Sequence, residues 1–128
     1  MREFLAVPES LRAAREFVTD HLSDMCCSLD AIEDARLLTS EVGTNAVRHA
    51  QTTTFSVEVE VVLGETIHVR VVDHDSRPPV HRPMDAMGEQ HRGLPILDEV
   101  AERWGVLAEP GGKAVWFELP CQSDRLTV

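Results

Sequence analysis

The stretch Glu41-Val-Gly-Thr-Asn45-Ala-Val-Arg48-His49-Ala50 has the spacing of a helix with one polar stripe. Glu41, Asn45 and His49 recur every four residues and therefore line one face, with Arg48 beside Asn45. A carboxylate one turn from an amide oxygen can activate a hydroxyl group and hold Mg²⁺, an ion that keeps waters and phosphates in its shell. The same spacing is also compatible with an ordinary solvated helix face.

The helix that carries this stripe is predicted to begin near Asp30 and to run to about Ala50. Asp30 and Glu33 have the spacing of a capping box, which marks a helix start. The face toward the core is expected to consist of Ile32, Ala35, Leu38, Val42 and Ala46. Gly43 costs about 1 kcal/mol relative to alanine inside a helix, which indicates that another element packs closely there.

The neighbouring segments predict a further helix and a hairpin. Upstream, we expect a short strand over residues 2–7 and a helix from Pro8 to about Ser23, since proline suits a first helical turn. Downstream, apolar residues alternate through 55–61 and again through 67–71. A turn at 63–65 separates these stretches, so they predict an antiparallel hairpin.

The second half of the chain is expected to contain a loop, a helix and a second hairpin. Prolines forbid regular structure over 74–91, and a loop of that length is usually functional or disordered. A third helix is predicted over 93–103. Strands over 104–108 and 113–119 follow, joined by a turn at 110–112. The order β-α-α-β-β-loop-α-β-β predicts an α+β two-layer sandwich with helices on one face of a mainly antiparallel sheet.

Size and charge narrow the classes of function. A chain of 128 residues fits one domain, so we expect a single domain over 1–128. The formal net charge of −10 repels phosphate backbones, so direct nucleic-acid binding is not expected. No apolar run reaches the roughly 18 residues of a membrane span. Three cysteines without a CxxC spacing fit the cytosol.

Two further motifs flank the predicted loop. Asp73 ends a predicted strand, where its carboxylate could accept a hydrogen bond from an amino group such as that of adenine, or could simply start a turn. Arg92-Gly93-Leu94 opens the third predicted helix, and free N–H groups at a helix start bind phosphate. Gly93 could equally relieve strain at the junction between loop and helix.

The cysteines, tryptophans and histidines outside these motifs are expected to have structural roles rather than to bind ligands. Cys26 and Cys27 lie between two predicted helices and are expected to be buried or partly buried thiols rather than redox groups. Trp104 and Trp116 are expected in the core. The histidines near the proline-rich loop have no spacing that implies a metal-binding geometry. A metal other than Mg²⁺ is therefore not expected.

Taken in order, these parts resemble the GHKL, or Bergerat-fold, ATPases over roughly residues 4–120. Glu41–Ala50 looks like their N box, in the E-x-x-x-N-A version typical of anti-sigma-factor serine kinases. Asp73 looks like the aspartate of the G1 box, Arg92–Leu94 like the end of the G2 box, and 110–119 like the closing hairpin. The resemblance implies a two-layer α/β sandwich with a mainly antiparallel, mixed sheet and helices on one face.

The resemblance also implies a role for each site residue. Glu41 would be the general base that takes a proton from a serine or threonine of a partner protein, and Asn45 would ligate Mg²⁺ bridging the ATP phosphates. Asp73 would select adenine, residues 76–91 would form the ATP lid, and Arg92–Leu94 would bind phosphate. The residues expected at the nucleotide are Asn45, Arg48, His49, Asp73, Arg92, Gly93 and Leu94.

The implied partners are proteins. In this branch the usual substrate is a STAS-type anti-sigma antagonist, the usual inhibited partner is an RNA polymerase sigma factor, and homodimers are common. The resemblance therefore implies a cytoplasmic serine/threonine kinase with anti-sigma activity that uses ATP and Mg²⁺ and contacts neither nucleic acid nor membrane.

The chain departs from the family's pattern in ways that favour an alternative. The G1 box should read roughly D-x-G-x-G, but residues 73–77 read Asp-His-Asp-Ser-Arg and lack both glycines. Many relatives have threonine where Ala114 stands, next to the adenine site. The alternative is a non-catalytic module of the same fold that sequesters a sigma factor or STAS protein with weak or no ATP turnover. The ATPase half of a sensor histidine kinase is a third reading, disfavoured because Glu41 is unusual for that branch.

Overall fold

The computed structural model of the chain describes residues 1–48, 53–74, 95–109 and 111–122. Its elements, in chain order, are β1 (Arg2–Leu5), α1 (Ser10–Asp24), α2 (Leu29–Arg48), β2 (Thr54–Val62), β3 (Thr66–Asp73), α4 (Pro95–Val100), β4 (Arg103–Glu109) and β5 (Gly112–Pro120). The order is the one that the sequence predicts.

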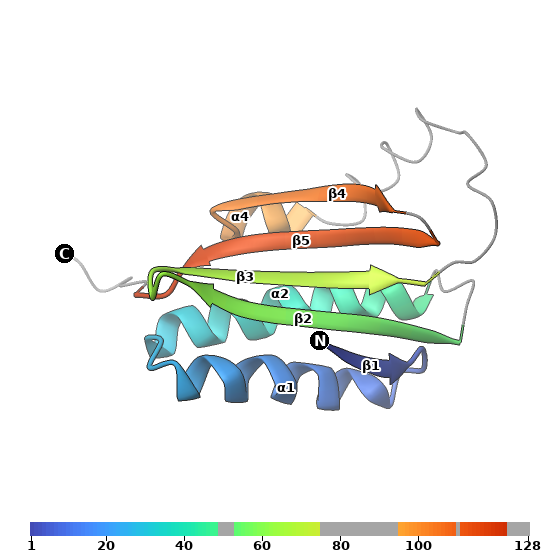
Figure 1. Cartoon of the computed structure of the whole chain (residues 1–128), viewed down its shortest axis with the longest axis horizontal. Coiled ribbons are helices and arrows are strands. Elements are labelled where there is room, and N and C mark those ends of the chain that lie inside the picture. The colour runs from blue at the N-terminus through green and yellow to red at the C-terminus, as the bar shows by residue number, and fades with distance from the viewer. Residues whose placement is uncertain (49–52, 75–94, 110, 123–128) are drawn as a thin grey trace.

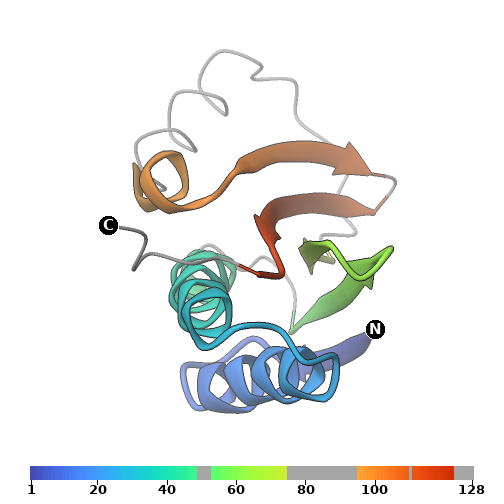
Figure 2. The same cartoon turned by 90° about the vertical axis from the view of Figure 1, so that its left-hand side faces the viewer.

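A five-stranded sheet with the order β1-β2-β3-β5-β4 forms one layer of the molecule. The helices pack on one face of this sheet and form the second layer (Figure 2). The α+β two-layer sandwich is therefore confirmed. Each pairing between the described strands is antiparallel, so the mixed component expected from the resemblance is not found among them.

The β2–β3 hairpin forms where the sequence alternates between apolar and polar residues. Val57 pairs with Val71, and Phe55 pairs with Asp73. Leu63 and Gly64 both have positive φ, 54° and 68°, as in the type I′ turns that match the twist of paired strands. Alternation therefore sends one row of side chains toward the helices and the next row away from them.

The core lies between α1, α2 and the sheet. Leu22 of α1, Leu38 of α2 and Phe117 of β5 are each fully buried there. Burial of a side chain of this size stabilises the folded state by roughly 1.5–3 kcal/mol. These contacts hold both long helices in fixed positions on the sheet.

Helix α2 begins one residue earlier than predicted, with a different cap. The Ala31 N–H donates to Ser28 Oγ at 3.2 Å, and the Ile32 N–H donates to the Ser28 carbonyl at 3.0 Å. Ser28 is therefore the N-cap, and the predicted Asp30–Glu33 capping box is wrong. The Ser28 N–H in turn donates to the Cys121 carbonyl at 2.9 Å, so a tertiary contact fixes the start of the helix.

The third helix ends earlier than predicted. Its described part covers Pro95–Val100, and Arg103 belongs to β4 instead. The Glu102 N–H donates to the Glu118 carbonyl at 2.9 Å, so pairing with β5 already begins there and ends the helix. Likewise β1 ends at Leu5, two residues before the predicted end.

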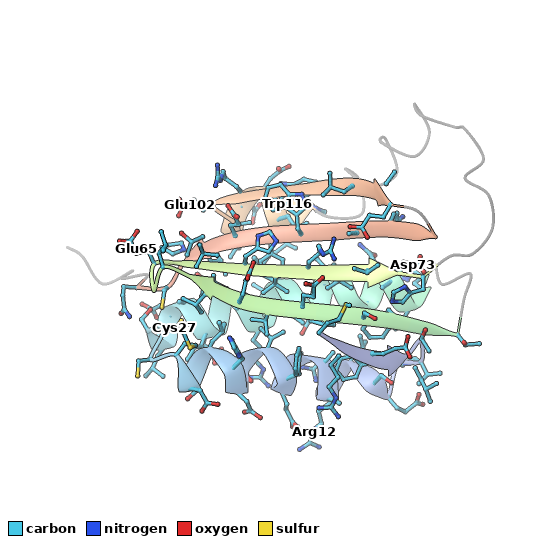
Figure 3. The ribbon with its side chains drawn as sticks, viewed as in Figure 1. Arg12, Cys27, Glu65, Asp73, Glu102 and Trp116 are labelled. Carbon is cyan, nitrogen blue, oxygen red and sulfur yellow. The ribbon has the colours of Figure 1, made fainter. Side chains whose placement is uncertain are left out.

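The two tryptophans lie on different sides of the sheet. Trp104 packs partly buried against the core, and its Nε1 donates to Asp98 Oδ1 at 2.8 Å, which joins β4 to α4. Trp116 lies on the face without helices (Figure 3). It stacks on His68 with ring centroids 5.8 Å apart. Its predicted core position is wrong, because its neighbour Phe117 fills the inner face. A Cβ at Gly105 would lie 2.8 Å from the indole nitrogen, so glycine makes room for the ring.

Helix α1 ends in a Schellman motif. The Cys27 N–H donates to the Leu22 carbonyl and the Cys26 N–H to the Ser23 carbonyl, both at 3.0 Å. Cys26 takes the left-handed position with φ 60°, where glycine is preferred because it has no Cβ. The motif turns Cys26 out into solvent and Cys27 into the interior, so the expectation of burial is wrong for Cys26.

Glu118 anchors a small ion-pair cluster on the helix-free face. A hydrogen bond of 3.0 Å joins it to His68 Nδ1, and Arg103 Nη2 lies 2.8 Å from its other oxygen. Burial alone raises the pKa of Glu118, but the hydrogen bonds from His68 and Arg103 outweigh burial, so the pKa lies below its ordinary value of 4.5.

Cys26→Gly should stabilise the fold by about 1 kcal/mol, since glycine adopts positive φ without a Cβ clash. Urea unfolding of the variant and the wild type measures the difference. Cys26→Ala is the matched control, because it removes the thiol but keeps the Cβ. Equal stability of the glycine and alanine variants would contradict strain at this position.

Glu118→Gln should lower the free energy of unfolding by about 1 kcal/mol or less at pH 7. Because the folded pKa is lowered, the carboxylate stabilises the fold above about pH 4.5, and this contribution is lost as the pH falls through the folded pKa. The difference from wild type should therefore shrink at pH 3, which urea unfolding at the two pH values tests. A difference that stays constant would refute the ionic contribution.

Candidate functional site

The rotation of α2 places the predicted polar stripe away from α1. A Cβ at Gly43 would lie 3.0 Å from Leu11 Cδ2, so this side of α2 faces α1 closely, as the mid-helix glycine predicts. Glu41 lies two residues before Gly43 and Asn45 lies two residues after it. Each of their side chains is therefore about 160° around the helix axis from the position of Gly43. They therefore point away from α1, on a helix that also packs against α4.

The stripe lies at the boundary between core and solvent. Val42 is buried, Asn45 is half-buried, and Glu41 and Arg48 are exposed. Glu41 is thus accessible from solvent, while the Asn45 side chain is partly shielded from it. An amide oxygen beside a carboxylate is a donor set that fits Mg²⁺, which takes few protein ligands and completes its shell with phosphates and waters. His49, also predicted here, lies outside the described residues.

Asp73 lies at the same end of the molecule as the C-terminal end of α2. It is the last residue of β3, and α2 packs against β3 (Figures 1 and 3). Asp73 is half-buried and follows the alternation of Val69 and Val71, so it projects from the helix-covered face. The fold thus brings Asp73 to the end of the sandwich at which α2, the helix that carries Glu41 and Asn45, terminates.

Lys113, the chain's one lysine, is a site residue that sequence reasoning missed. It pairs directly with Asp73 across β3 and β5, and directly opposed residues have Cβ atoms about 4.5–5.5 Å apart. Ala114 instead pairs with Val72, on the face of the sheet opposite to Asp73. Counting back in twos from Phe117 would have shown that Lys113, and not Ala114, shares the inner face.

His74 fixes the chain directly after Asp73. Its Nε2 lies 2.6 Å from the Oγ of Ser56, a buried residue of β2. This bond holds the end of β3 against β2 and so limits the movement of the Asp73 backbone. Among the described residues, no group of three His, Cys, Asp or Glu side chains could hold a metal ion.

The remaining predicted site residues cannot be placed. Arg92, Gly93 and Leu94, together with the predicted lid over 76–91, lie outside the described residues. The chain leaves the described fold after His74 at the end of β3. It returns at α4, which packs against α2.

Two surface hollows lie elsewhere. One is between β1 and α1, beside Phe17, and the other is on the helix-free face around His68. Neither is lined by Glu41, Asn45 or Asp73. The candidate site is therefore assigned from its side-chain chemistry rather than from the depth of a cavity.

Comparison with family models identifies the type of domain. Residues 4–119 match the family described as the histidine kinase-like ATPase domain, a span that includes α2, Asp73 and Lys113. A comparison with curated proteins finds no similar sequence. In the described part of the chain, every helix is too short or too polar to cross a membrane. Because the match covers most of its length, the chain belongs to the family of histidine kinase-like ATPase domains, which implies that it binds ATP.

Proposed function

We propose that the protein is an ATP- and Mg²⁺-dependent serine/threonine kinase of the anti-sigma type. Its substrate would be a STAS-type anti-sigma antagonist, and the partner it inhibits would be an RNA polymerase sigma factor. A cytoplasmic homodimer is part of this proposal. The observation that carries it is the exposed Glu41 one helical turn from the half-buried Asn45, on a helix whose C-terminal end lies at the same end of the molecule as Asp73.

The proposed chemistry assigns one task to each of these side chains. Glu41 takes the proton from the serine or threonine hydroxyl of the partner protein. The hydroxyl oxygen then bonds to the γ-phosphorus of ATP, and the bond between that phosphorus and the ADP oxygen breaks. Mg²⁺ held by Asn45 would neutralise charge on the phosphates. The exposure of Glu41 supports this role, because the hydroxyl arrives on another protein.

Asp73 is proposed to recognise adenine. Its carboxylate would accept a hydrogen bond from the adenine amino group, and the bond between His74 and Ser56 holds the adjoining backbone in place. Being half-buried, Asp73 would make this bond partly shielded from water, where hydrogen bonds to a charged group are stronger.

A second candidate function is a binding module of the same fold with weak or no turnover. Lys113 stands directly across from Asp73, so its ammonium group would compete with adenine for that carboxylate. The G1 glycines are also missing at positions 75 and 77, where aspartate and arginine stand. Both features would weaken nucleotide binding and leave a partner-binding surface intact.

Calorimetric titration with ATP and ADP, with and without Mg²⁺, distinguishes the two functions. The kinase proposal expects micromolar, Mg²⁺-dependent binding that weakens at least tenfold in Asn45→Ala, because that change removes the proposed ligand. Circular dichroism of the variant controls for folding. An absence of binding at millimolar nucleotide would reject the kinase proposal and favour the binding module.

Glu41→Ala should lower phosphorylation of a STAS substrate at least 100-fold, the usual effect of losing a general base. Binding of the partner protein, measured separately, should remain. Glu33→Ala is the matched control, since it removes another exposed carboxylate from α2. Phosphorylation by Glu41→Ala at the wild-type rate would show that the base is a different residue.

A further inference from the structure

Two buried thiols from distant parts of the chain lie in segments that a backbone hydrogen bond joins. Cys27 lies in the turn between α1 and α2 and is 8% exposed, while Cys121 directly follows β5 and is 1% exposed. Both side chains belong to the same buried core cluster, and the peptide N–H that follows Cys27 donates to the Cys121 carbonyl. Neither thiol has a role in the proposed kinase chemistry, which lies at the other end of the molecule.

Backbone hydrogen bonds hold both cysteines in place. The Ser28 N–H donates to the Cys121 carbonyl at 2.9 Å, and the Cys121 N–H donates to the Glu65 carbonyl at 2.8 Å. Gln122 Nε2 donates to the Cys26 carbonyl at 3.0 Å, which adds a second link between the two segments. The backbone geometry therefore holds the segments that carry the two thiols side by side.

The Schellman motif explains why only one of the adjacent cysteines takes part. Cys26 adopts the left-handed conformation and points into solvent, whereas Cys27, the next residue, points inward. A direct bridge between adjacent residues would require a strained ring, whereas Cys27 and Cys121 come from separate segments that already touch.

We propose that Cys27 and Cys121 form a modification site at which a peroxide produces a reversible intramolecular disulfide. One thiolate attacks a peroxide oxygen, which gives a sulfenic acid and releases water. The second thiolate then attacks that sulfur, the S–S bond forms, and the sulfenic oxygen leaves as a second water. The two sulfurs lose two electrons in total, and hydrogen peroxide gains them.

Burial sets the conditions for this reaction. Burial, and next the interaction with the Cys121 side chain, raise the pKa of Cys27 to about 12, so the Cys27 thiol stays protonated at neutral pH and reacts slowly. The same burial shields the finished bridge from external thiolates, which slows its reduction. Exposed Cys26 is the competing thiol, and it favours bonds between molecules.

The bridge would act on stability and not on the nucleotide site. It closes a ring through most of the chain and so restricts the unfolded state, where long loops give the largest effect. Cys27 and Asp73 lie at opposite ends of the molecule (Figure 3). Oxidation should therefore raise the melting temperature while the geometry around Asp73 stays unchanged.

The test uses the Cys26→Ser variant, which keeps both proposed partners and removes the exposed competitor. After treatment with hydrogen peroxide, non-reducing tryptic digestion should link peptide 16–36 to peptide 114–125, each with one cysteine left in this variant. Thiol titration in denaturant should show both thiols lost together. The melting temperature should rise by roughly 5 °C or more and return after dithiothreitol.

Cys121→Ser in the same background is the matched control and should give no linked peptide. The proposal would be overturned if two titratable thiols persisted after oxidation. It would also be overturned if disulfides formed only between molecules, in covalent dimers. The test stays valid even if the Cys121→Ser control fails to fold. The linkage itself is measured in Cys26→Ser, where both buried cysteines remain. The result is independent of the proposed kinase activity, since no nucleotide or partner is involved.

Discussion

The packing of α2 against β3 and β5 is the constraint on which the rest of the structure depends. Leu38 and Val42 are buried in this contact, and Gly43 lets α1 approach from the side. Together they fix the rotation of the helix about its axis. That rotation leaves Glu41 in solvent and Asn45 half-buried, so the placement of these side chains follows from core packing.

The strand register makes the other half of the site. Because side chains alternate along β3 and β5, Asp73 and Lys113 share the helix-covered face and stand directly opposite each other. A carboxylate paired with an ammonium group is a weaker acceptor for a neutral ligand than one held by neutral donors. Under the proposed adenine role of Asp73, the residue opposite it in the register therefore bears on how strongly the domain would bind nucleotide.

The two ends of the sandwich have different tasks. At one end, the termini of α2 and β3 gather the polar residues of the candidate site. At the other, the α1–α2 turn, Cys121 and the start of β3 are joined by backbone hydrogen bonds around a buried thiol pair. Chemistry that strengthens the second end can change the stability of the whole domain, because the core between the ends is continuous.

The sequence by itself determined the order of helices and strands and the family, because helical and strand periodicities are local and the motifs keep their order along the chain. Tertiary structure decided the features that depend on contacts between residues far apart in the sequence. The cap at Ser28 is set by a bond to Cys121, and Trp116 faces outward because the sheet register assigns it to that face. Lys113 meets Asp73 for the same reason. Periodicity shows which residues share a face, but only the register between strands decides which residues meet across it.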